Sequence, residues 1–359
     1  MTKLIPEEAG RAWLDVDLAA LGRNARRFAE LAGAPLLPMV KADGYGLGAV
    51  SVTRALEALD PWGYGVATPP EGARLRQAGI TRSIVVFSPL QVDAGQLEAV
   101  QANRLTPVIG DLAALDAWLA RSGGPFHLEV DTGMGRSGFH WRDQAAIEGL
   151  RDRLQRAPAW EGVFTHFHSP DTDQGSVQTQ LDRFGAVLGA LPRGAALVHT
   201  ANSAAGGLAA VRGGDLARPG IFLYGGEVGI ESPEPVARLS ARIVAIRRLE
   251  PGDSVSYGAT WHAQRATTIA TLSIGYGDGV LRSLSNRGVV ELNGELLPIA
   301  GRVTMDMLMV DAGDTPVGLG DTATVFGGRV TLDEQARHAG TNGYELLTAV
   351  SARVERRYS

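Results

Sequence analysis

Hydrophobic residues recur in short runs along the first 225 positions, and segments with a helical period of apolar and polar residues separate them. The starts of successive runs are 20 to 36 residues apart, which leaves room for one helix between neighbouring runs. The runs predict strands at 36–41, 62–67, 83–88, 106–109, 126–131, 162–167, 196–200 and 221–224. Amphipathic segments predict helices at 18–31, 112–121 and 144–156. Eight strands alternating with helices favour a closed (β/α)8 TIM-type barrel, with an open doubly wound sheet as the alternative.

The hydrophobic pattern changes after about residue 235. Short runs with alternating apolar residues, such as ARIVAIRRL and TTIATLSIGYG, are now separated by Gly, Pro and Asp turns. This pattern of short alternating runs and turn residues predicts a second, mainly β domain of short strands. A helical segment at 331–340 interrupts it, and the tail at 348–359 is compatible with a strand or a short helix.

Composition narrows the class of protein. The net charge is −5 and no long basic run occurs, so neither nucleic acid nor an anionic membrane is an expected partner. Cysteine is absent, which excludes a disulfide framework, a thiolate metal site and a cysteine nucleophile. The N-terminus lacks the apolar centre of a signal peptide, and no run reaches membrane-spanning length. These features predict a cytoplasmic protein.

Polar side chains lie where the predicted strands end, which is the catalytic rim of a (β/α)8 barrel. They are Lys41, Glu129, Asp131, Arg136, His166, His199, Asn202, Ser203 and Arg218, with Gly220 directly beside the eighth run. Lys41 follows the apolar run LLPMV and precedes the glycine-rich turn ADGYGLG, so it is a candidate ion-pair partner, phosphate clamp or Schiff-base nucleophile. The loops HTANSAAGG and RPGIFLYG are rich in Gly and Ser, and corresponding loops of such barrels often bind phosphate.

Eight short motifs, in order over nearly the whole chain, resemble those of the alanine racemase family. They are VKADGYGLG (40–48), VDTGMGRSG (130–138), THF (165–167), HTANSA (199–204), RPGI (218–221), SYGATW (256–261), GYGDG (275–279) and GRVTMD (301–306). The resemblance implies an enzyme that interconverts L- and D-alanine with pyridoxal 5'-phosphate. It implies a cofactor-binding barrel at 12–236, and a mainly β domain made of 1–11 and 237–359.

The resemblance also assigns roles around the cofactor. Lys41 would hold it covalently, and the amine must be neutral to react, which desolvation at a barrel mouth favours. Arg218 would face the pyridine nitrogen and, as a permanent donor, keep that nitrogen unprotonated and the ring a weaker electron sink. The other residues expected at the cofactor, most of them around its phosphate, are Tyr45, His166, Asn202, Ser203, Gly220, Ile221 and Tyr344.

Racemisation needs a proton donor or acceptor on both faces of the α-carbon. The resemblance implies Lys41 for one face and Tyr257 of a partner subunit for the other, and hence a homodimer with shared active sites. A tyrosine is a weak base at neutral pH, so we expect a positive neighbour, His166 bonded to Arg218. Arg136 and the amide of Met305 would bind the substrate carboxylate. The positions that match the family's substrate entrance are Asp171, Tyr276 and Arg302.

Two positions depart from the family pattern. Glu129 stands where the family often has a carbamylated lysine, and we expect Arg136 to lower the pKa of this carboxyl and keep it ionised. Arg136 would lean toward Glu129, or a water would bridge them. His168 follows THF at a position where small residues are commoner, and no role is assigned to it.

Other functions remain open at this point. A metal-dependent barrel hydrolase would use His166, His168, Asp171 and His199 as ligands but would leave Lys41 and Tyr257 without a role. A racemase of broader specificity, acting on serine and other amino acids, fits the same motifs. A related decarboxylase is disfavoured because the familiar ones use a cysteine from the partner subunit. A non-catalytic cofactor carrier is disfavoured because such barrels usually lack the second domain. The expected metal content is none.

Overall fold

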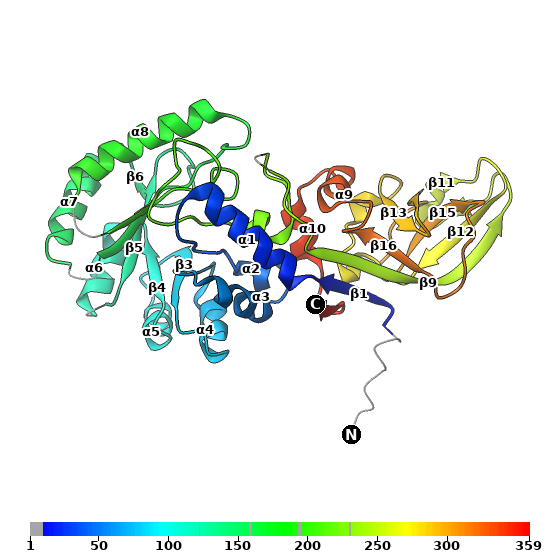
Figure 1. Cartoon of the computed structure of the whole chain (residues 1–359), viewed down its shortest axis with the longest axis horizontal. Helices are drawn as coiled ribbons and strands as arrows, with labels where there is room; N and C mark the ends of the chain where they lie inside the picture. The colour runs from blue at the N-terminus through cyan, green and yellow to red at the C-terminus, as the bar shows by residue number, and fades with distance from the viewer. Residues whose placement is uncertain (1–9, 122, 158–159, 193–195, 230) are drawn as a thin grey trace, which may run out of the picture.

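The protein is described here by a computed structural model that covers residues 10–121, 123–157, 160–192, 196–229 and 231–359. Two parts lie side by side along the longest axis of the molecule (Figure 1). One contains a parallel sheet surrounded by helices, and the other consists mainly of antiparallel strands.

The first part is the predicted barrel. Its parallel strands run in the order of the sequence: β2 (Gly63–Val66), β3 (Ser83–Pro89), β4 (Thr106–Ile109), β5 (Phe126–Asp131), β7 (Trp160–Phe164) and β8 (Leu197–His199), with the short β6 (Phe139–His140) beside β5. Isolated parallel bridges close the circle. Asn202 pairs with Arg218, Leu36 with Ala217, and Met39 with Gly65 of β2. Segments 36–40 and 216–219 therefore complete the barrel between β8 and β2.

Two predicted strands differ from the observed structure. The run at 36–41 forms bridges only up to Met39, and Lys41 already begins the short helix α2 (Lys41–Tyr45). The apolar run at 221–224 is not a strand but the 3₁₀ helix η3 (Ile221–Tyr224), and the preceding residues 216–219 take the eighth place in the barrel. Burial of every η3 side chain gives this turn a strand-like hydrophobic pattern.

Helices pack around the outside of the barrel sheet (Figure 1). They are α1 (Leu18–Ala32), α3 (Ala49–Leu56), α4 (Pro69–Gln77), α5 (Ala94–Ala102), α6 (Leu112–Ala120), α7 (Gln144–Leu154) and α8 (Gln174–Ala190), with the 3₁₀ turn η2 (Glu57–Leu59) after α3. The helices predicted at 18–31, 112–121 and 144–156 are thus confirmed. Their starts have a common cause, because an aspartate precedes each of α1, α5, α6, α7 and α8 and its carboxylate accepts an amide of the first turn.

The second domain is built on an eight-stranded sheet with the order β14-β13-β16-β9-β1-β17, to which β12 adds beside β9 and β15 beside β12. Its strands are β1 (Ala12–Val16), β9 (Ala237–Leu249), β12 (Thr267–Leu272), β13 (Val289–Leu292), β14 (Glu295–Pro298), β15 (Leu308–Gly313), β16 (Thr322–Phe326) and β17 (Glu355–Tyr358). A separate hairpin pairs β10 (Ser254–Val255) with β11 (Trp261–His262). Short 3₁₀ turns are η4 (Tyr257–Ala259), η5 (Tyr276–Asp278) and η6 (Arg282–Leu284). The predicted helix at 331–340 is α9 (Leu332–Ala339), and α10 (Gly343–Ala349) was not predicted.

Strand β1 corrects the expected domain boundary at residue 12. It pairs antiparallel with β9 and parallel with β17, so residues 12–16 belong to the sheet of the second domain. Arg11 donates to Asp278 and to the carbonyl of Ser273, both in the second domain. Residues 1–9, which were expected to join that domain too, lie outside the described residues.

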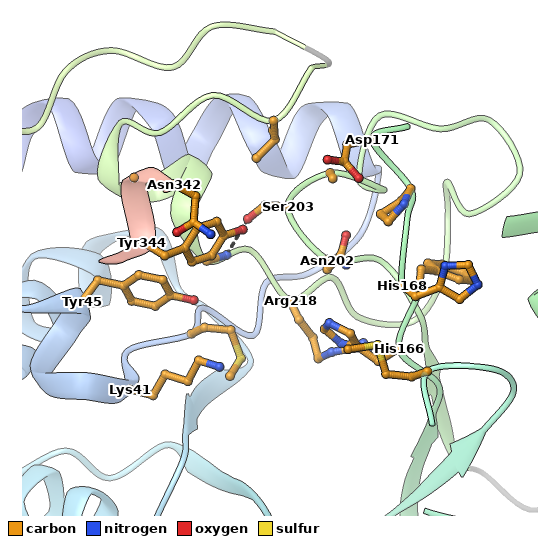
Figure 2. A pocket seen from close by; sticks show the side chains of 18 of the residues that line it. Lys41, Tyr45, His166, His168, Asp171, Asn202, Ser203, Arg218, Asn342 and Tyr344 are labelled. Carbon is orange, nitrogen blue, oxygen red and sulfur yellow. Dashed lines mark hydrogen bonds between the residues drawn. The ribbon is translucent and has the colours of Figure 1, made fainter. Parts of the chain in front are cut away.

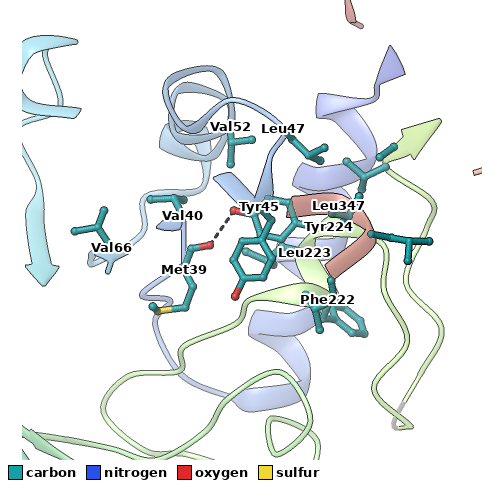
Figure 3. Packing of buried hydrophobic residues seen from close by; sticks show 14 of the residues in the cluster. Met39, Val40, Tyr45, Leu47, Val52, Val66, Phe222, Leu223, Tyr224 and Leu347 are labelled. Atoms are coloured by element: carbon teal, nitrogen blue, oxygen red, sulfur yellow. Dashed lines mark hydrogen bonds between the residues drawn. The ribbon is translucent and has the colours of Figure 1, made fainter. Parts of the chain in front are cut away.

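The junction between the two parts surrounds the loop after Lys41. Figure 3 shows the apolar side chains packed beneath this loop, where the Tyr224 hydroxyl donates to the Met39 carbonyl at 2.8 Å. From the second domain, the Arg356 guanidinium donates to the Gly46 carbonyl at 2.9 and 3.1 Å. A Cβ at Gly46 would collide with the carbonyl of Leu347 in α10, so glycine permits this close approach. Within the described residues, no helix is long and apolar enough to cross a membrane.

Candidate active site

A cavity of about 450 Å³ opens at the carboxyl ends of the barrel strands, where α10 of the second domain covers them (Figure 2). Most of the predicted cofactor and substrate residues line this one cavity. They are Lys41, Tyr45, Arg136, His166, Asn202, Ser203, Arg218, Gly220 and Tyr344. His168 and Asp171 lie at its edge as well, and Ile221 directly follows Gly220 as the first residue of η3.

Lys41 reaches the cavity because the chain turns sharply behind it. Ala42, Asp43, Gly44 and Tyr45 all adopt left-handed backbone angles, with φ between 51 and 63°. Such a run is costly for residues other than glycine and persists only where the surroundings enforce it. Glu71 helps to do so, since its carboxylate accepts the Ala42 amide at 2.8 Å.

The electrostatic surroundings favour a neutral amine on Lys41. Burial lowers the pKa of this ammonium, and the positive charge of Arg136 lowers it further, while Glu71 opposes them. A neutral amine is the nucleophilic form that adds to a carbonyl carbon. Figure 2 shows the Lys41 side chain extended toward the cavity, on the same side as Tyr45.

Hydroxyl groups gather beside the Gly220 backbone. The Ser203 hydroxyl accepts the Gly220 amide at 2.7 Å, and the centroid of the Tyr45 ring lies 4.4 Å from that of Tyr224 and 6.0 Å from that of Tyr344. Burial raises the pKa of Tyr45, and it raises that of Tyr344 to about 12. Both phenols therefore stay protonated and can donate hydrogen bonds to an anion. A Cβ at Gly220 would overlap the Tyr45 hydroxyl, so this corner requires glycine.

Arg218 is 3% exposed and is held by its barrel neighbours. One terminal nitrogen donates to the His199 ring at 2.7 Å and to the His199 carbonyl at 2.8 Å, and the other donates to the Thr165 carbonyl at 2.9 Å. Burial lowers the pKa of Arg218 to about 9, although Glu129 opposes the shift. The guanidinium still carries its charge at neutral pH.

His166 differs from the expectation. Burial and the positive charges of Arg218, Arg136 and Lys41 lower its pKa to about 3, so the ring is neutral and cannot supply positive charge. Over the described residues, no hydrogen bond joins His166 to Arg218, whose ring partner is His199 instead. The missing charge has an electrostatic cause, because desolvation and the nearby positive groups, Arg218 first, oppose protonation of this imidazole.

Glu129 also behaves differently from the prediction. It is 3% exposed, accepts the Ser137 hydroxyl at 2.7 Å and lies 3.7 Å from a guanidinium nitrogen of Arg136. The Arg136 side chain therefore leans toward Glu129, which is the first of the two arrangements expected from the sequence. Burial nevertheless raises the pKa of this carboxyl, and Ser137 and Arg136 offset the shift only in part, so the predicted lowering was wrong.

A second group of predicted residues lies away from the cavity, on loops of the second domain. The Ser256 hydroxyl donates to the Arg302 carbonyl at 2.7 Å, and the Tyr276 and Gly277 amides bond the carbonyls of residues 304 and 305, which brings three loops together. Tyr257 is 73% exposed on this loop cluster, and Met305 is 52% exposed. The structure thus separates Tyr257, Tyr276, Arg302 and Met305 from the cavity of their own chain.

The ligand set proposed for a metal hydrolase is not assembled. Across the described residues, no three His, Asp or Glu side chains are placed to hold one metal ion. His199 is fully buried and bonded to Arg218 and His127, and His168 bonds Ser169 at the surface. This arrangement removes the support for a metal-dependent hydrolase.

Several residues of the site were missed from the sequence. Asn342 and Asp333 line the cavity from the second domain, and Gln180 of α8 holds the His166 carbonyl at 3.0 Å. Asn342 carries a recognisable signal, since its side chain caps α10 and the sequence NGYE is typical of a helix start. Gln180 gives no local signal, because its partners are distant in sequence.

Together these groups define a site for a carbonyl cofactor that carries a phosphate. A lysine amine with a lowered pKa, protonated hydroxyls beside a glycine backbone and a buried guanidinium fit the three parts of pyridoxal phosphate, namely its carbonyl, its phosphate and its ring nitrogen. The residues present thus suit this cofactor on their own chemistry.

Comparisons with known proteins specify the family. A family model of the N-terminal domain of alanine racemase matches residues 16–228, and one of the C-terminal domain matches 236–358. The chain therefore belongs to the alanine racemase family. Alanine racemase from Desulfovibrio desulfuricans is 37% identical over 96% of this chain and 97% of its own, and that from Deinococcus radiodurans is 38% identical over 97% and 99%.

Solved structures agree with this placement. Biosynthetic alanine racemase from Pseudomonas aeruginosa superposes with a TM-score of 0.89 at 35% identity, covering 98% of this chain and 99% of the other. Alanine racemase from Bartonella henselae, solved with covalently bound pyridoxal phosphate, gives 0.89 at 29% identity over 98% and 100%. The predictions of the family and of a barrel followed by a mainly β domain are thereby confirmed.

Proposed function

We propose that this enzyme interconverts L- and D-alanine with pyridoxal phosphate held by Lys41, and that a second copy of the chain supplies Tyr257 as the opposing acid and base. Family membership over the full length supports the reaction and the cofactor. One observation carries the shared site: Lys41 lines a cavity, whereas Tyr257 is 73% exposed on the other domain.

The chain's own residues would hold the cofactor at three points. Lys41 binds its carbonyl carbon, and the hydroxyls of Tyr45, Ser203 and Tyr344 donate to its phosphate together with the amides of Gly220 and Ile221. The Gly220 amide bonds the Ser203 hydroxyl in this structure, so phosphate would replace that partner. Asn202 and His166, as a neutral ring, complete the walls.

When bound, the cofactor withdraws electrons from the α-carbon of an attached amino acid and makes its hydrogen acidic. Arg218 limits this withdrawal, because a guanidinium donates hydrogen bonds and does not give up a proton at neutral pH. A ring nitrogen held by Arg218 would accept from this guanidinium and stay unprotonated, which would make the ring a weaker electron sink. This would suit racemisation, because Lys41 and Tyr257 could return a proton to the α-carbon before a proton is added elsewhere.

Residues at the mouth of the cavity would recognise the substrate. The Arg136 side chain is about half exposed there and can pair with a carboxylate, and the Met305 amide of the partner copy would add a second donor. The barrel, the second domain and a loop of the partner would together enclose one cavity of about 450 Å³. Such an enclosure favours a small amino acid. Alanine fits this limit, and a broader range that includes serine is tested with the same assay. The cytoplasmic location stays a prediction of the sequence.

The two proton-transfer groups would come from different subunits. Lys41 takes or returns a proton on one face of the α-carbon, and Tyr257 of the partner does so on the other face. Tyr257 shares its loop cluster with Tyr276, Arg302 and Met305, so docking this cluster over a partner's cavity delivers all four residues together. Because His166 is neutral, the positive charge that assists Tyr257 would come from a guanidinium: Arg218 or Arg136 in the cavity, or Arg302 on the loop cluster of Tyr257.

Complementation between inactive chains tests this proposal. Lys41→Ala and Tyr257→Phe chains are each expected to lack racemase activity, and mixing them with subunit exchange should restore one complete site per heterodimer. The assay follows loss of optical rotation for L-alanine and L-serine with added cofactor, and exchange is verified with differently tagged chains. A mixture that exchanges subunits yet stays inactive would show that Tyr257 does not act across the interface.

A further inference from the structure

Four polar side chains form a continuous path through the barrel interior, from the cavity to the opposite end of the strands. Arg218 contacts Nδ1 of His199 at 2.7 Å, and Nε2 of His199 contacts Nδ1 of His127 at 2.8 Å. Nε2 of His127 lies 3.4 Å from a carboxylate oxygen of Glu161. His199, His127 and Glu161 do not line the cavity, and the proposed function gives them no role.

The direction of this path follows from hydrogen-bond chemistry. A guanidinium only donates, so Nδ1 of His199 must accept and the neutral ring must carry its hydrogen on Nε2. That hydrogen points at Nδ1 of His127, which must accept in turn and carry its own hydrogen on Nε2. Nε2 of His127 then faces a carboxylate oxygen of Glu161 at 3.4 Å, and this oxygen can only accept. Both hydrogen bonds thus donate away from Arg218, and the contact with Glu161 continues the path in the same direction without a regular hydrogen bond.

Packing leaves the two rings little freedom to change partners. Both imidazoles are fully buried, the Phe164 ring stacks on His199 at 5.0 Å, and Trp62 lies 5.7 Å from His127. A Cβ at residue 162 would lie only 2.6 Å from the His127 ring, so Gly162 makes room for it. Burial also lowers the pKa of both histidines, which keeps them neutral.

Among the described residues, no group other than Glu161 is placed to accept from Nε2 of His127. Nε2 of His127 and the facing oxygen of Glu161 are both buried, and neither has a hydrogen-bond partner among the described residues, since the two atoms stand 3.4 Å apart without forming a regular hydrogen bond. A buried donor and a buried acceptor without partners each cost free energy. A small shift that closes the gap between His127 and Glu161 would satisfy both groups at once.

The path also determines which hydrogen Arg218 offers to the cavity. His199 and the carbonyls of residues 165, 199 and 200 take the hydrogens of its two terminal nitrogens. Within the described chain no acceptor is bonded to Nε, so its hydrogen remains for a ligand. The opposite tautomer of His199 would place two donors face to face and turn the guanidinium.

We propose that His199, His127 and Glu161 are positioning residues that form a one-directional hydrogen-bond relay, which fixes the orientation of Arg218 from the far end of the barrel. Its effect on the cofactor rests on the proposed function, whereas the relay itself is a property of the chain alone. Glu161 anchors the relay by requiring a hydrogen on Nε2 of His127. A change at this remote residue should therefore alter the environment of the cofactor ring.

Nitrogen NMR of the full-length protein labelled with ¹⁵N-histidine tests the relay without reference to activity. Signals are assigned with His127→Gln and His199→Gln. Both buried rings are expected to show a protonated Nε2 and an unprotonated Nδ1. A hydrogen on Nδ1 of either ring, or a doubly protonated ring, overturns the proposal. Inactivity of the wild-type enzyme would count against the proposed function and would leave this result intact.

Variants at Glu161 test whether the relay is continuous from Glu161 through His127 to His199. Glu161→Ala is expected to shift the Nε2 hydrogen signals of both histidines upfield, because the bonds of a chain reinforce one another. Glu161→Gln retains an oxygen acceptor and should give a smaller shift, and Glu148→Gln, at an exposed glutamate of α7, should give none. An unchanged His199 signal in Glu161→Ala means that the relay is interrupted and the proposal is wrong.

The holoenzyme gives a second readout. Glu161→Ala should change the visible absorption of the bound cofactor and lower kcat about tenfold at an unchanged KM, the loss expected for one hydrogen bond to a charged group. A purely structural role would lower the amount of folded enzyme and leave spectrum and kcat per active site as in the Glu148→Gln control. That outcome overturns the link to Arg218.

Discussion

Glu129→Gln removes one charge beside Arg136, just behind the cavity lining, and changes little else. The amide keeps the shape of the side chain and still accepts the Ser137 hydroxyl, now 2.7 Å from the carboxylate. The lost interaction is the one with Arg136 at 3.7 Å. At an effective dielectric constant near 20, this pair would be worth about 4 kcal/mol. The Arg136 side chain is 54% exposed, however, so screening reduces the contribution to about 1 kcal/mol.

A loss of this size corresponds to a roughly fivefold higher KM for alanine, because Arg136 is no longer aimed at the substrate carboxylate. The measurement is initial racemisation rate against alanine concentration, with Glu98→Gln, an exposed glutamate of α5, as the control. Wild-type activity should also be indifferent to dissolved carbon dioxide, since Glu129 carries its carboxyl permanently. A KM in Glu129→Gln equal to that of the wild type would refute the reasoning.

The same variant should show a pH-dependent gain in stability. Burial raises the pKa of Glu129 above its ordinary value of 4.5, so ionising this carboxyl costs folding free energy. Below the unfolded pKa both states are protonated and the cost is absent; it grows as the pH rises above the unfolded pKa and is complete once the pH exceeds the folded pKa. Glu129→Gln should therefore match the wild type in thermal unfolding at acidic pH and exceed it at neutral pH. Equal melting temperatures at neutral pH would contradict the direction of the shift.

Two further changes test the cofactor site. Lys41→Ala should abolish racemisation, and borohydride reduction of the wild-type enzyme followed by peptide mapping should place the cofactor on Lys41; a label on another lysine would disprove the assignment. Gly220→Ala should weaken cofactor binding at least about tenfold in equilibrium dialysis, because its Cβ overlaps the Tyr45 hydroxyl, whereas Gly189→Ala, where a Cβ meets nothing, should bind normally.

The hydrophobic pattern predicted the barrel because its strands and helices have different periods and alternate regularly. It failed at IFLY (221–224), since a buried 3₁₀ turn and a buried strand leave the same apolar run. It also failed at β1, whose partners β9 and β17 lie more than 200 residues away and leave no local mark. Long-range pairing of this kind cannot be read from a single sequence.

The cavity residues were predicted from motifs, but their electrostatics were not. Proximity to a cation suggested a lowered pKa for Glu129, and the structure shows that burial outweighs it. His166 was expected to carry charge, and desolvation together with the guanidinium groups of Arg218 and Arg136 prevents this. Burial is a property of the assembled fold, so neither sign was accessible from residue types. The His127–His199 contact was missed for the same reason, because 72 residues separate the two rings.

Strand β1 gives the molecule an inserted architecture. The sheet of the second domain takes one strand from the start of the chain and the rest from its last third, so the whole barrel is inserted between β1 and β9. Two chain segments therefore connect the barrel to its neighbour, and the last residue, Ser359, bonds the backbone on both sides of the first connection, at Val16 and Leu18. During synthesis, β1 must wait for β9 and β17 to emerge before it finds its partners. The two connections also restrict rotation between the domains, which keeps Tyr344 of the second domain opposite Lys41 across the cavity.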